Sequence, residues 1–184
     1  MIIRQTDFIG LTLINPKIFS DDRGLFLETD QYSRYASMGI SDIFVQDNQS
    51  WSKKGVLRGM HFQVTNPQAQ LITVIKGVIF DVVVDLRKNS KTYGKWFGVQ
   101  LGGDQFSQIY MAPGFAHGFY VLSEEAGLHY KVTQEYDPLD EGGIIWNDAD
   151  ISINWPDGQK ILASKDLAFP AFKNIDSTRL PQAY

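Results

Sequence analysis

The sequence contains no cysteine among its 184 residues, which excludes disulfide bonds, thiolate zinc sites and a cysteine nucleophile. Positive charge is also scarce, because 17 lysines and arginines stand against 21 acidic residues and leave a net charge of −4. A protein that binds nucleic acid is usually basic, so we expect no nucleic-acid partner. The apolar run within residues 1–14 is too short to span a membrane, and no cleavage signal follows it. We therefore expect a cytoplasmic protein without membrane contact.

What the sequence does contain is typical of a globular protein with a full core, since 43% of its residues are apolar and 13% are aromatic. It shows no internal repeat, linker or low-complexity segment, so we expect one domain over residues 1–184. From residue 44 to about 155, short β-prone segments are separated by turn-forming clusters. Many short strands at near-regular spacing predict an all-β sandwich or barrel. The expected strands are 43–50, 70–76, 78–86, 95–101, 107–111, 118–122, 127–134 and 143–147.

Other structure is expected near the two ends of the chain. Residues 8–14 alternate like a first strand. Thr29 or Asp30 is in position to cap a short helix over residues 31–38. The tail from Leu162 carries two prolines and is expected to be irregular or weakly helical.

The three histidines are candidates for chemistry, and His61 has the most unusual neighbours. It lies in residues 55–63, with Arg58 three positions before it and glycines that allow sharp turns. His117 follows a tight turn at the start of an expected strand. His129 alternates out of phase with Tyr130, so it lies on the surface if Tyr130 points into a barrel. We place His61 at the mouth of the sheet; the alternative for each histidine is a purely structural role.

A metal site is a competing interpretation for histidines in a small β-barrel. Such a site needs three or four converging ligands, and Met60 stands where a His-x-His pair would need another histidine. We therefore expect no metal.

Arginines and amides predict an anionic, sugar-like ligand. Arg23 and Arg58 lie next to or near glycines, where a guanidinium can approach an anion with two hydrogen bonds, although surface salt bridges are the alternative. Gln46 and Asn48 share one face of a strand, and Phe26 near Arg23 is in position either to stack on a base or to join the core. An amide-lined pocket flanked by arginine suits a sugar that bears phosphate. The proton-donor candidates are Tyr130, Tyr136 and Asp166; tyrosine is a weak acid suited to quenching a carbanion-like intermediate.

Several ordered motifs over about residues 8 to 166 resemble the dTDP-4-dehydrorhamnose 3,5-epimerases. They are Asp22-Arg-Gly-x-Phe-x-Glu28, Val45-Gln-Asp-Asn-x-Ser50, Gly55-Val-Leu-Arg-Gly-x-His-x-Gln63, Phe80-Asp-Val-x-Val-Asp-Leu-Arg87, Gly114-Phe-Ala-His-Gly-Phe119, Trp146-Asn-Asp148, Ile153-x-Trp-Pro156 and Ser164-Lys-Asp166. The resemblance implies a cupin-type antiparallel β-barrel (jelly roll) with one or two short helices. It also implies a homodimer that uses neither a metal nor an organic cofactor.

The resemblance further implies an activity and roles for residues. Members of this family epimerise dTDP-4-dehydro-6-deoxy-glucose at carbons 3 and 5 to dTDP-4-dehydro-L-rhamnose, on the route to dTDP-L-rhamnose and surface polysaccharide. At the matching positions, His61 resembles the catalytic base, Asp166 its orienting partner and Tyr130 the acid on the opposite face. The remaining positions resemble substrate contacts: Gln46, Asn48, Arg58 and His117 for the sugar and diphosphate, Tyr136 for the nucleotide, and Arg23, Phe26 and Glu28 for the nucleotide across the dimer interface.

One segment departs from the family pattern. The family usually reads Gln-x-Lys-Leu-Val-Arg where this chain has Gln68-Ala-Gln-Leu-Ile-Thr73, so Gln70 stands in place of a lysine that faces the developing enolate. A neutral amide still donates a hydrogen bond but lacks the charge. The alternatives are therefore an epimerase acting at carbon 3 or 5 only, one using a CDP- or GDP-linked sugar, a keto-sugar 3,4-isomerase, and a non-catalytic protein that binds sugar nucleotides.

Overall fold

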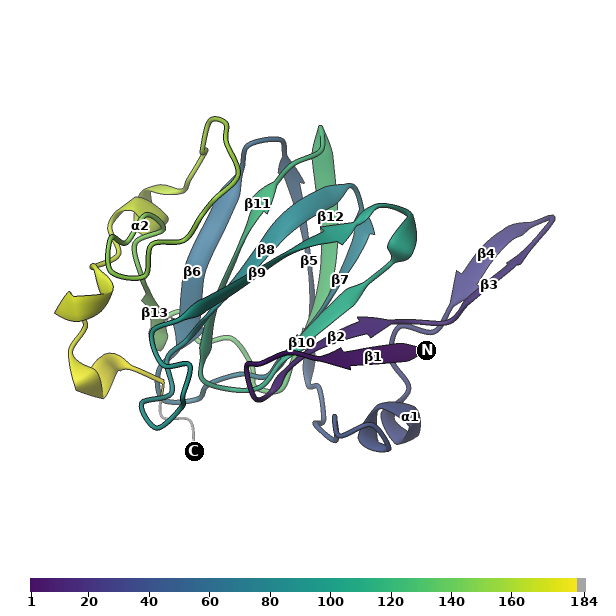
Figure 1. The fold of residues 1–184 in the computed structure, drawn as a ribbon, viewed down its shortest axis with the longest axis horizontal. Coiled ribbons are helices and arrows are strands. Elements are labelled where there is room, and N and C mark those ends of the chain that lie inside the picture. Colours follow the sequence, from purple (N-terminus) through teal and green to yellow (C-terminus); the bar gives the residue numbers. More distant parts are fainter. Residues whose placement is uncertain (182–184) are drawn as a thin grey trace.

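The structure is a computed structural model that describes residues 1–181, with the side chains of all of these except Gln105. Its strands pair antiparallel in two large sheets and one separate hairpin (Figure 1). In spatial order, the six-stranded sheet consists of β1 (Ile2–Gln5), β2 (Leu11–Asn15), β10 (Gln108–Met111), β7 (Gln70–Lys76), β12 (Glu125–Val132) and β5 (Gln46–Lys53). The five-stranded sheet consists of β13 (Glu141–Gly143), β6 (Leu57–Gln63), β11 (Phe115–Val121), β8 (Val78–Asp85) and β9 (Trp96–Gly102).

Helical structure in the described chain is short. It comprises α1 (Tyr32–Ala36), α2 (Ser164–Leu167) and the 3-10 turns η1 (Gly103–Gln105), η2 (Phe172–Asn174) and η3 (Ser177–Arg179). None of the described helices is both long and apolar enough to cross a membrane. The predicted fold class, an antiparallel cupin-type β-barrel with short helices, is confirmed.

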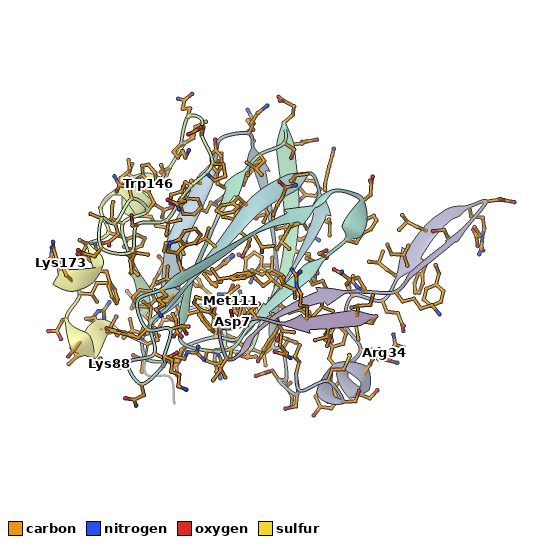
Figure 2. The ribbon with its side chains drawn as sticks, in the orientation of Figure 1. Asp7, Arg34, Lys88, Met111, Trp146 and Lys173 are labelled. Atoms are coloured by element: carbon orange, nitrogen blue, oxygen red, sulfur yellow. The ribbon has the colours of Figure 1, made fainter. Side chains whose placement is uncertain are left out.

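The main core lies between the two sheets. Successive strand residues point to opposite faces, so Ile79 and Val83 of β8 face inward while Val82 and Val84 face outward. The inward residues meet apolar side chains of the six-stranded sheet, and Figure 2 shows Met111, which is 1% exposed, within this layer. Burying each such side chain contributes roughly 1.5–3 kcal/mol.

Both sheets are also covered on their outer faces. The segment around α1 packs Tyr35 and Ile40 onto Leu71 of the six-stranded sheet. The C-terminal segment packs Trp155 and Phe172 against the outer face of the five-stranded sheet. A strand buried on both faces is apolar along its whole length, which explains why the sequence of β8 reads as a nearly continuous apolar run.

The predicted strand bounds are close for most strands and correct for β7, but three regions differ. The strand expected over residues 143–147 is wrong beyond its first residue, because β13 covers Glu141–Gly143. The first strand, expected over residues 8–14, begins only at Leu11 as β2, because Gly10 adopts a φ of +85° in a turn before it, and β1 precedes that turn. Residues 57–63, which the sequence presents as glycine-rich turns, form strand β6. Gly59 is needed there because a Cβ atom on it would lie 2.6 Å from the Cα atom of Gly118 on β11.

The predicted helix cap is wrong. Helix α1 begins after Gln31, and neither Thr29 nor Asp30 caps it with a side chain. The carbonyl oxygen of Thr29 instead accepts hydrogen bonds from the Tyr35 hydroxyl and the Gln108 amide, at 2.9 and 2.7 Å. These bonds hold the segment before α1 against the six-stranded sheet.

The hairpin formed by β3 (Ile18–Asp21) and β4 (Gly24–Leu27) is called the arm below. It pairs with neither large sheet and extends away from the barrel (Figure 1). Its apolar side chains are exposed, and Phe26 retains 65% of its accessible surface. Exposed apolar surface of this extent commonly marks an interaction site.

Candidate active site

A cavity of about 500 Å³ opens between the two sheets, on the side where α2 packs against β6. Its volume lies within the range of pockets that hold small molecules. Apolar side chains of Ile72, Phe119 and Leu128 line part of it. Of the residues predicted from the sequence, the cavity brings together Gln46, Asn48, Arg58, His61, Gln70, His117, Tyr130, Tyr136 and Asp166.

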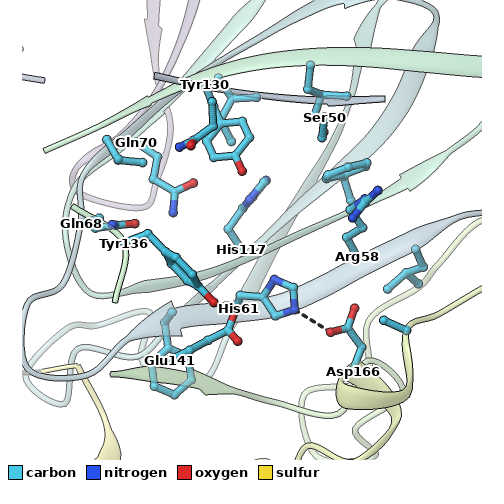
Figure 3. Close-up of a pocket in the computed structure, with 18 of the residues that line it drawn as sticks. Ser50, Arg58, His61, Gln68, Gln70, His117, Tyr130, Tyr136, Glu141 and Asp166 are labelled. Atoms are coloured by element: carbon cyan, nitrogen blue, oxygen red, sulfur yellow. Dashed lines mark hydrogen bonds and ion pairs between the residues drawn. The ribbon is translucent and has the colours of Figure 1, made fainter. Parts of the chain in front are cut away.

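His61 and Asp166 form a hydrogen-bonded pair on one wall of the cavity (Figure 3). Strand β6 supplies His61 and the short helix α2 supplies Asp166, whose Oδ1 lies 2.7 Å from Nε2 of His61. The backbone N–H of Gly59 donates a second hydrogen bond to Asp166 Oδ2 at 3.3 Å. The ring of Phe169 meets the imidazole edge-on, with ring centres 5.6 Å apart. These contacts fix the plane of the ring and leave Nδ1 without a partner among the described residues.

The environment of Asp166 keeps it ionised. Burial alone would raise its pKa, since the residue is 2% exposed. The hydrogen bond and charge of His61, the Gly59 N–H and the charge of Lys165 outweigh burial, so the pKa of Asp166 lies below its ordinary value. A buried carboxylate in this position stabilises positive charge on an imidazole ring next to it.

Tyr130 reaches the same cavity from the opposite sheet. It lies on β12 between Asn48 of β5 and Ile72 of β7. Burial raises the pKa of its phenol, and the nearby charges of Arg58 and Lys165 only partly oppose this. The hydroxyl is therefore protonated at neutral pH. Figure 3 shows Tyr130 and His61 entering the cavity from different sides.

Amide side chains form a polar wall next to Tyr130. The amide of Gln46 donates to Asn48 Oδ1 at 2.8 Å, and its oxygen accepts the backbone N–H of Tyr136 at 2.9 Å. On β6, Arg58 Nε donates to Ser52 Oγ at 3.1 Å, which orients the guanidinium while leaving its other N–H groups available. Gln70 lines the cavity from the start of β7. This wall is suited to hydroxyl and phosphate groups.

The structure adds cavity residues that the sequence did not indicate. Lys165 forms an ion pair with Glu141 at 2.8 Å, and both line the cavity. Gln68 also lines it, and so does Gln63, an amide that the sequence motif over residues 55–63 had already included. A further residue, Asp81, lies behind His117 at 2.8 Å from its Nε2 atom. An acidic residue at an inward position in the middle of a mostly apolar strand was the available signal for Asp81.

Three predicted contacts lie outside the cavity of their own chain. Arg23, at the tip of the arm, forms an ion pair with Asp21, and its side chain is 90% exposed. Phe26 is exposed on β4, and Glu28 pairs with Arg34 at 2.5 Å near the base of the arm. Their predicted role toward the nucleotide stays a prediction.

His129 lies on the outer face of β12, 4.0 Å from Asp47, as the alternation with Tyr130 predicts. Across residues 1–181, apart from the side chain of Gln105, no three His, Asp or Glu side chains gather in a cluster suited to a metal ion.

Comparison with known proteins places this geometry in a family. A sequence model described as dTDP-4-dehydrorhamnose 3,5-epimerase matches residues 5–174. The chain belongs to the dTDP-4-dehydrorhamnose 3,5-epimerase family. The 3,5-epimerase of Methanothermobacter thermautotrophicus is 48% identical over 152 residues, which cover 83% of this chain and 82% of that protein.

Other relatives in the epimerase family bear on structure and on specificity. A Legionella pneumophila epimerase structure in complex with dTDP-4-keto-L-rhamnose superposes with a TM-score of 0.95 at 46% identity, covering 99% of this chain and 98% of that one. A Streptomyces niveus protein named dTDP-4-dehydrorhamnose 3-epimerase is 39% identical over 168 residues, covering 90% of this chain and 81% of that protein. The predicted family is therefore confirmed.

Proposed function

We propose that this chain is an isomerase that inverts carbons 3 and 5 of dTDP-4-dehydro-6-deoxy-glucose to give dTDP-4-dehydro-L-rhamnose. The observation that carries the proposal is the pairing of His61 with Asp166 on one wall of the cavity, with Tyr130 entering from the opposite sheet. A base on one face of a sugar ring and an acid on the other are what inversion at carbon requires.

The first step is removal of a proton from the carbon next to the ketone. Nδ1 of His61 has no partner among the described side chains and accepts that proton, while Asp166 holds Nε2 and stabilises the imidazolium. The electron pair of the broken C–H bond moves into the carbonyl and leaves an enolate. Histidine suits the step because its ordinary pKa lies near neutrality.

The second step delivers a proton to the opposite face of the same carbon. The phenol of Tyr130 is held protonated by its buried environment, and its O–H bond breaks as the new C–H bond forms. A weak acid suffices because the enolate carbon is a much stronger base than a phenolate. Exchange with solvent returns the proton to Tyr130 and removes the one on His61, so the enzyme is unchanged after each inversion.

Binding of the nucleotide sugar requires groups beyond this chain's own cavity. We place the arm of one subunit at the cavity of a second subunit in a homodimer, so that Arg23 and Phe26 contact the nucleotide there. Support comes from the exposure of the arm's apolar side chains and from the distance of the arm from its own barrel in Figure 1. Arg58 and Tyr136 of the cavity then contact the diphosphate and the base.

The reaction is tested by incubating the protein with dTDP-4-keto-6-deoxyglucose in deuterated water and following the label by NMR. Label at carbons 3 and 5 is expected, and His61→Ala should abolish it. Label at one carbon would favour the single-centre alternative, for which the related 3-epimerase is a precedent. A migrated carbonyl would indicate an isomerase of the 3,4 type, and no exchange with dTDP-, CDP- or GDP-linked substrate would indicate a binding protein.

The shared site is tested with two inactive variants, Arg23→Ala and His61→Ala, dissociated and reassociated as a mixture. A hybrid dimer has one site with an intact base and an intact arm from the other subunit. An equal mixture should recover about a quarter of wild-type activity, because half of the dimers are hybrids with one complete site of two. If the arm served its own subunit, the mixture would stay inactive.

A further inference from the structure

A second carboxylate–imidazole pair lies in the cavity beside the first. Strand β11 places His117 directly opposite His61 of β6, and Nε2 of His117 lies 2.8 Å from Asp81 Oδ2 on β8. The His117 side chain is 13% exposed, whereas Asp81 is completely buried. Its other oxygen, Oδ1, is buried and has no hydrogen-bond partner among the residues that the structure describes. Within that part of the chain, Asp81 depends on His117 alone for hydrogen bonding.

The two carboxylates differ in how their charge is compensated. Asp166 accepts a backbone N–H as well as the imidazole, and Lys165 is close enough to lower its pKa. Asp81 has no such support, and a buried carboxylate is strongly disfavoured unless a charged partner offsets it. The partner available is the imidazole of His117.

We infer that Asp81 is a positioning residue that holds His117 as an imidazolium, with Nδ1 directed at the oxygen on which the enolate charge develops. The inference rests on the proposed function. Figure 3 places His117 in the middle of the cavity, between the base His61 and the acid Tyr130. Nδ1 of His117 makes no hydrogen bond to any described residue and is the donor left for a ligand.

A positively charged His117 would compensate for a charge that this chain lacks at position 70. Gln70 provides only a neutral amide where the family pattern has a lysine, and the ammonium group of Lys165 is already paired with Glu141. The Nε group of Arg58 on β6 already donates a hydrogen bond to Ser52 on β5. Asp81 of β8 lies behind His117, and the described charged and titratable side chains that line the cavity with it are Arg58, His61, Tyr130, Tyr136, Glu141, Lys165 and Asp166. An imidazolium at this position supplies the positive charge that Gln70 lacks.

The test is a double-mutant cycle between Asp81→Asn and Gln70→Lys. An asparagine keeps the shape of Asp81 but removes the charge, so kcat should fall about 100-fold while KM changes by less than about threefold. A lysine at position 70 restores a cation near the oxyanion. It should raise kcat about thirtyfold in the Asp81→Asn background but only about threefold in the wild type, a coupling that independent sites do not show.

Asp85→Asn is the matched control. Asp85 is also completely buried on β8, four residues along, but it binds Arg87, Ser90 and Thr92 instead of a cavity residue. Its variant should lose stability, keep the kcat of the folded protein, and respond to Gln70→Lys as the wild type does.

A spectroscopic measurement tests the same inference without turnover. In ¹⁵N NMR at neutral pH, His117 of the wild type should carry protons on both ring nitrogens and should lose one in Asp81→Asn. A neutral His117 in the wild type, or equal effects of Gln70→Lys in both backgrounds, overturns the role of Asp81. A wild-type protein that exchanges no deuterium into the substrate overturns the proposed function itself.

Discussion

Replacement of Asp166 by asparagine is expected to inactivate the enzyme without unfolding it. The buried Gly59 N–H still requires a hydrogen-bond acceptor, so the amide oxygen of the new side chain should take the place of Oδ2. That choice turns the amide NH2 group toward Nε2 of His61, where the carboxylate oxygen now lies at 2.7 Å. An NH2 group donates, so neutral His61 must carry its proton on Nδ1. The nitrogen that faces the substrate is then unable to accept a proton.

The size of the effect follows from this change of tautomer. The corresponding aspartate-to-asparagine swap in a serine protease triad lowers kcat by about 10⁴. We expect kcat to fall by about 10³ to 10⁴ here, which corresponds to about 4–5.5 kcal/mol of lost transition-state stabilisation. KM should change little, because Asp166 lies behind the base.

The assay is initial-rate deuterium incorporation at carbons 3 and 5, with thermal unfolding measured on the same samples. Asp148→Asn is the control, since Asp148 is also a buried carboxylate that accepts backbone N–H groups, from Asp150, Ile151 and Phe172. It lies outside the cavity, so its variant should lose stability but keep its rate per folded molecule. A loss below tenfold in folded Asp166→Asn would refute the assignment of Asp166 as the partner of the base.

Three further predictions address the acid, the enolate and acid stability. Tyr130→Phe should permit exchange by His61 but slow inversion by about 100-fold, measured as product formed per deuterium incorporated. Gln70→Lys should raise kcat about threefold on the dTDP substrate in steady-state assays; an unchanged or lower kcat would count against a cation deficit at this position. For Asp85, burial raises the pKa, but the bonds from Arg87, Ser90 and Thr92 outweigh it and hold the pKa below the ordinary 3.8. The stabilisation by the Asp85 carboxylate is complete above that value and is lost as pH falls below it. The free energy of unfolding, measured with urea, should therefore decrease from about pH 5 downward, and it should decrease less steeply in Asp85→Asn.

Alternation along the sequence was sufficient to predict most of the sheet. Strand β7 has the predicted bounds, and the phase of Tyr130 against His129 correctly separated the cavity face of β12 from its outer face. These predictions succeed because successive side chains of a strand point to opposite faces, so the face of each residue can be read from its position in the sequence.

Other features depend on contacts between distant segments. Strand β6 contains Gly59, which looks like a turn residue in sequence but is required because β11 passes too close for a side chain. Thr29 looks like a helix cap, yet its carbonyl bonds to Tyr35 and Gln108 outweigh that local preference. The partnership of Asp81 with His117 joins two neighbouring strands that lie 36 residues apart in the chain, and alternation does not report it. The motifs identified His61, Asp166 and Tyr130 by resemblance, whereas the contacts that hold them required the fold.

The chemistry of inversion follows from the way the cavity is built. The proposed base, His61, comes from the five-stranded sheet and the proposed acid, Tyr130, from the six-stranded sheet, and packed sheets generally lie about 10 Å apart. Between the side chains that extend inward from both sheets lies a cavity of about 500 Å³. In the proposed mechanism, a sugar ring held in that space presents one face to His61 and the other to Tyr130. Both carbons next to the ketone lie on that same ring, so a modest rotation of the sugar brings each in turn between the same base and acid, and one pair of residues suffices for two inversions.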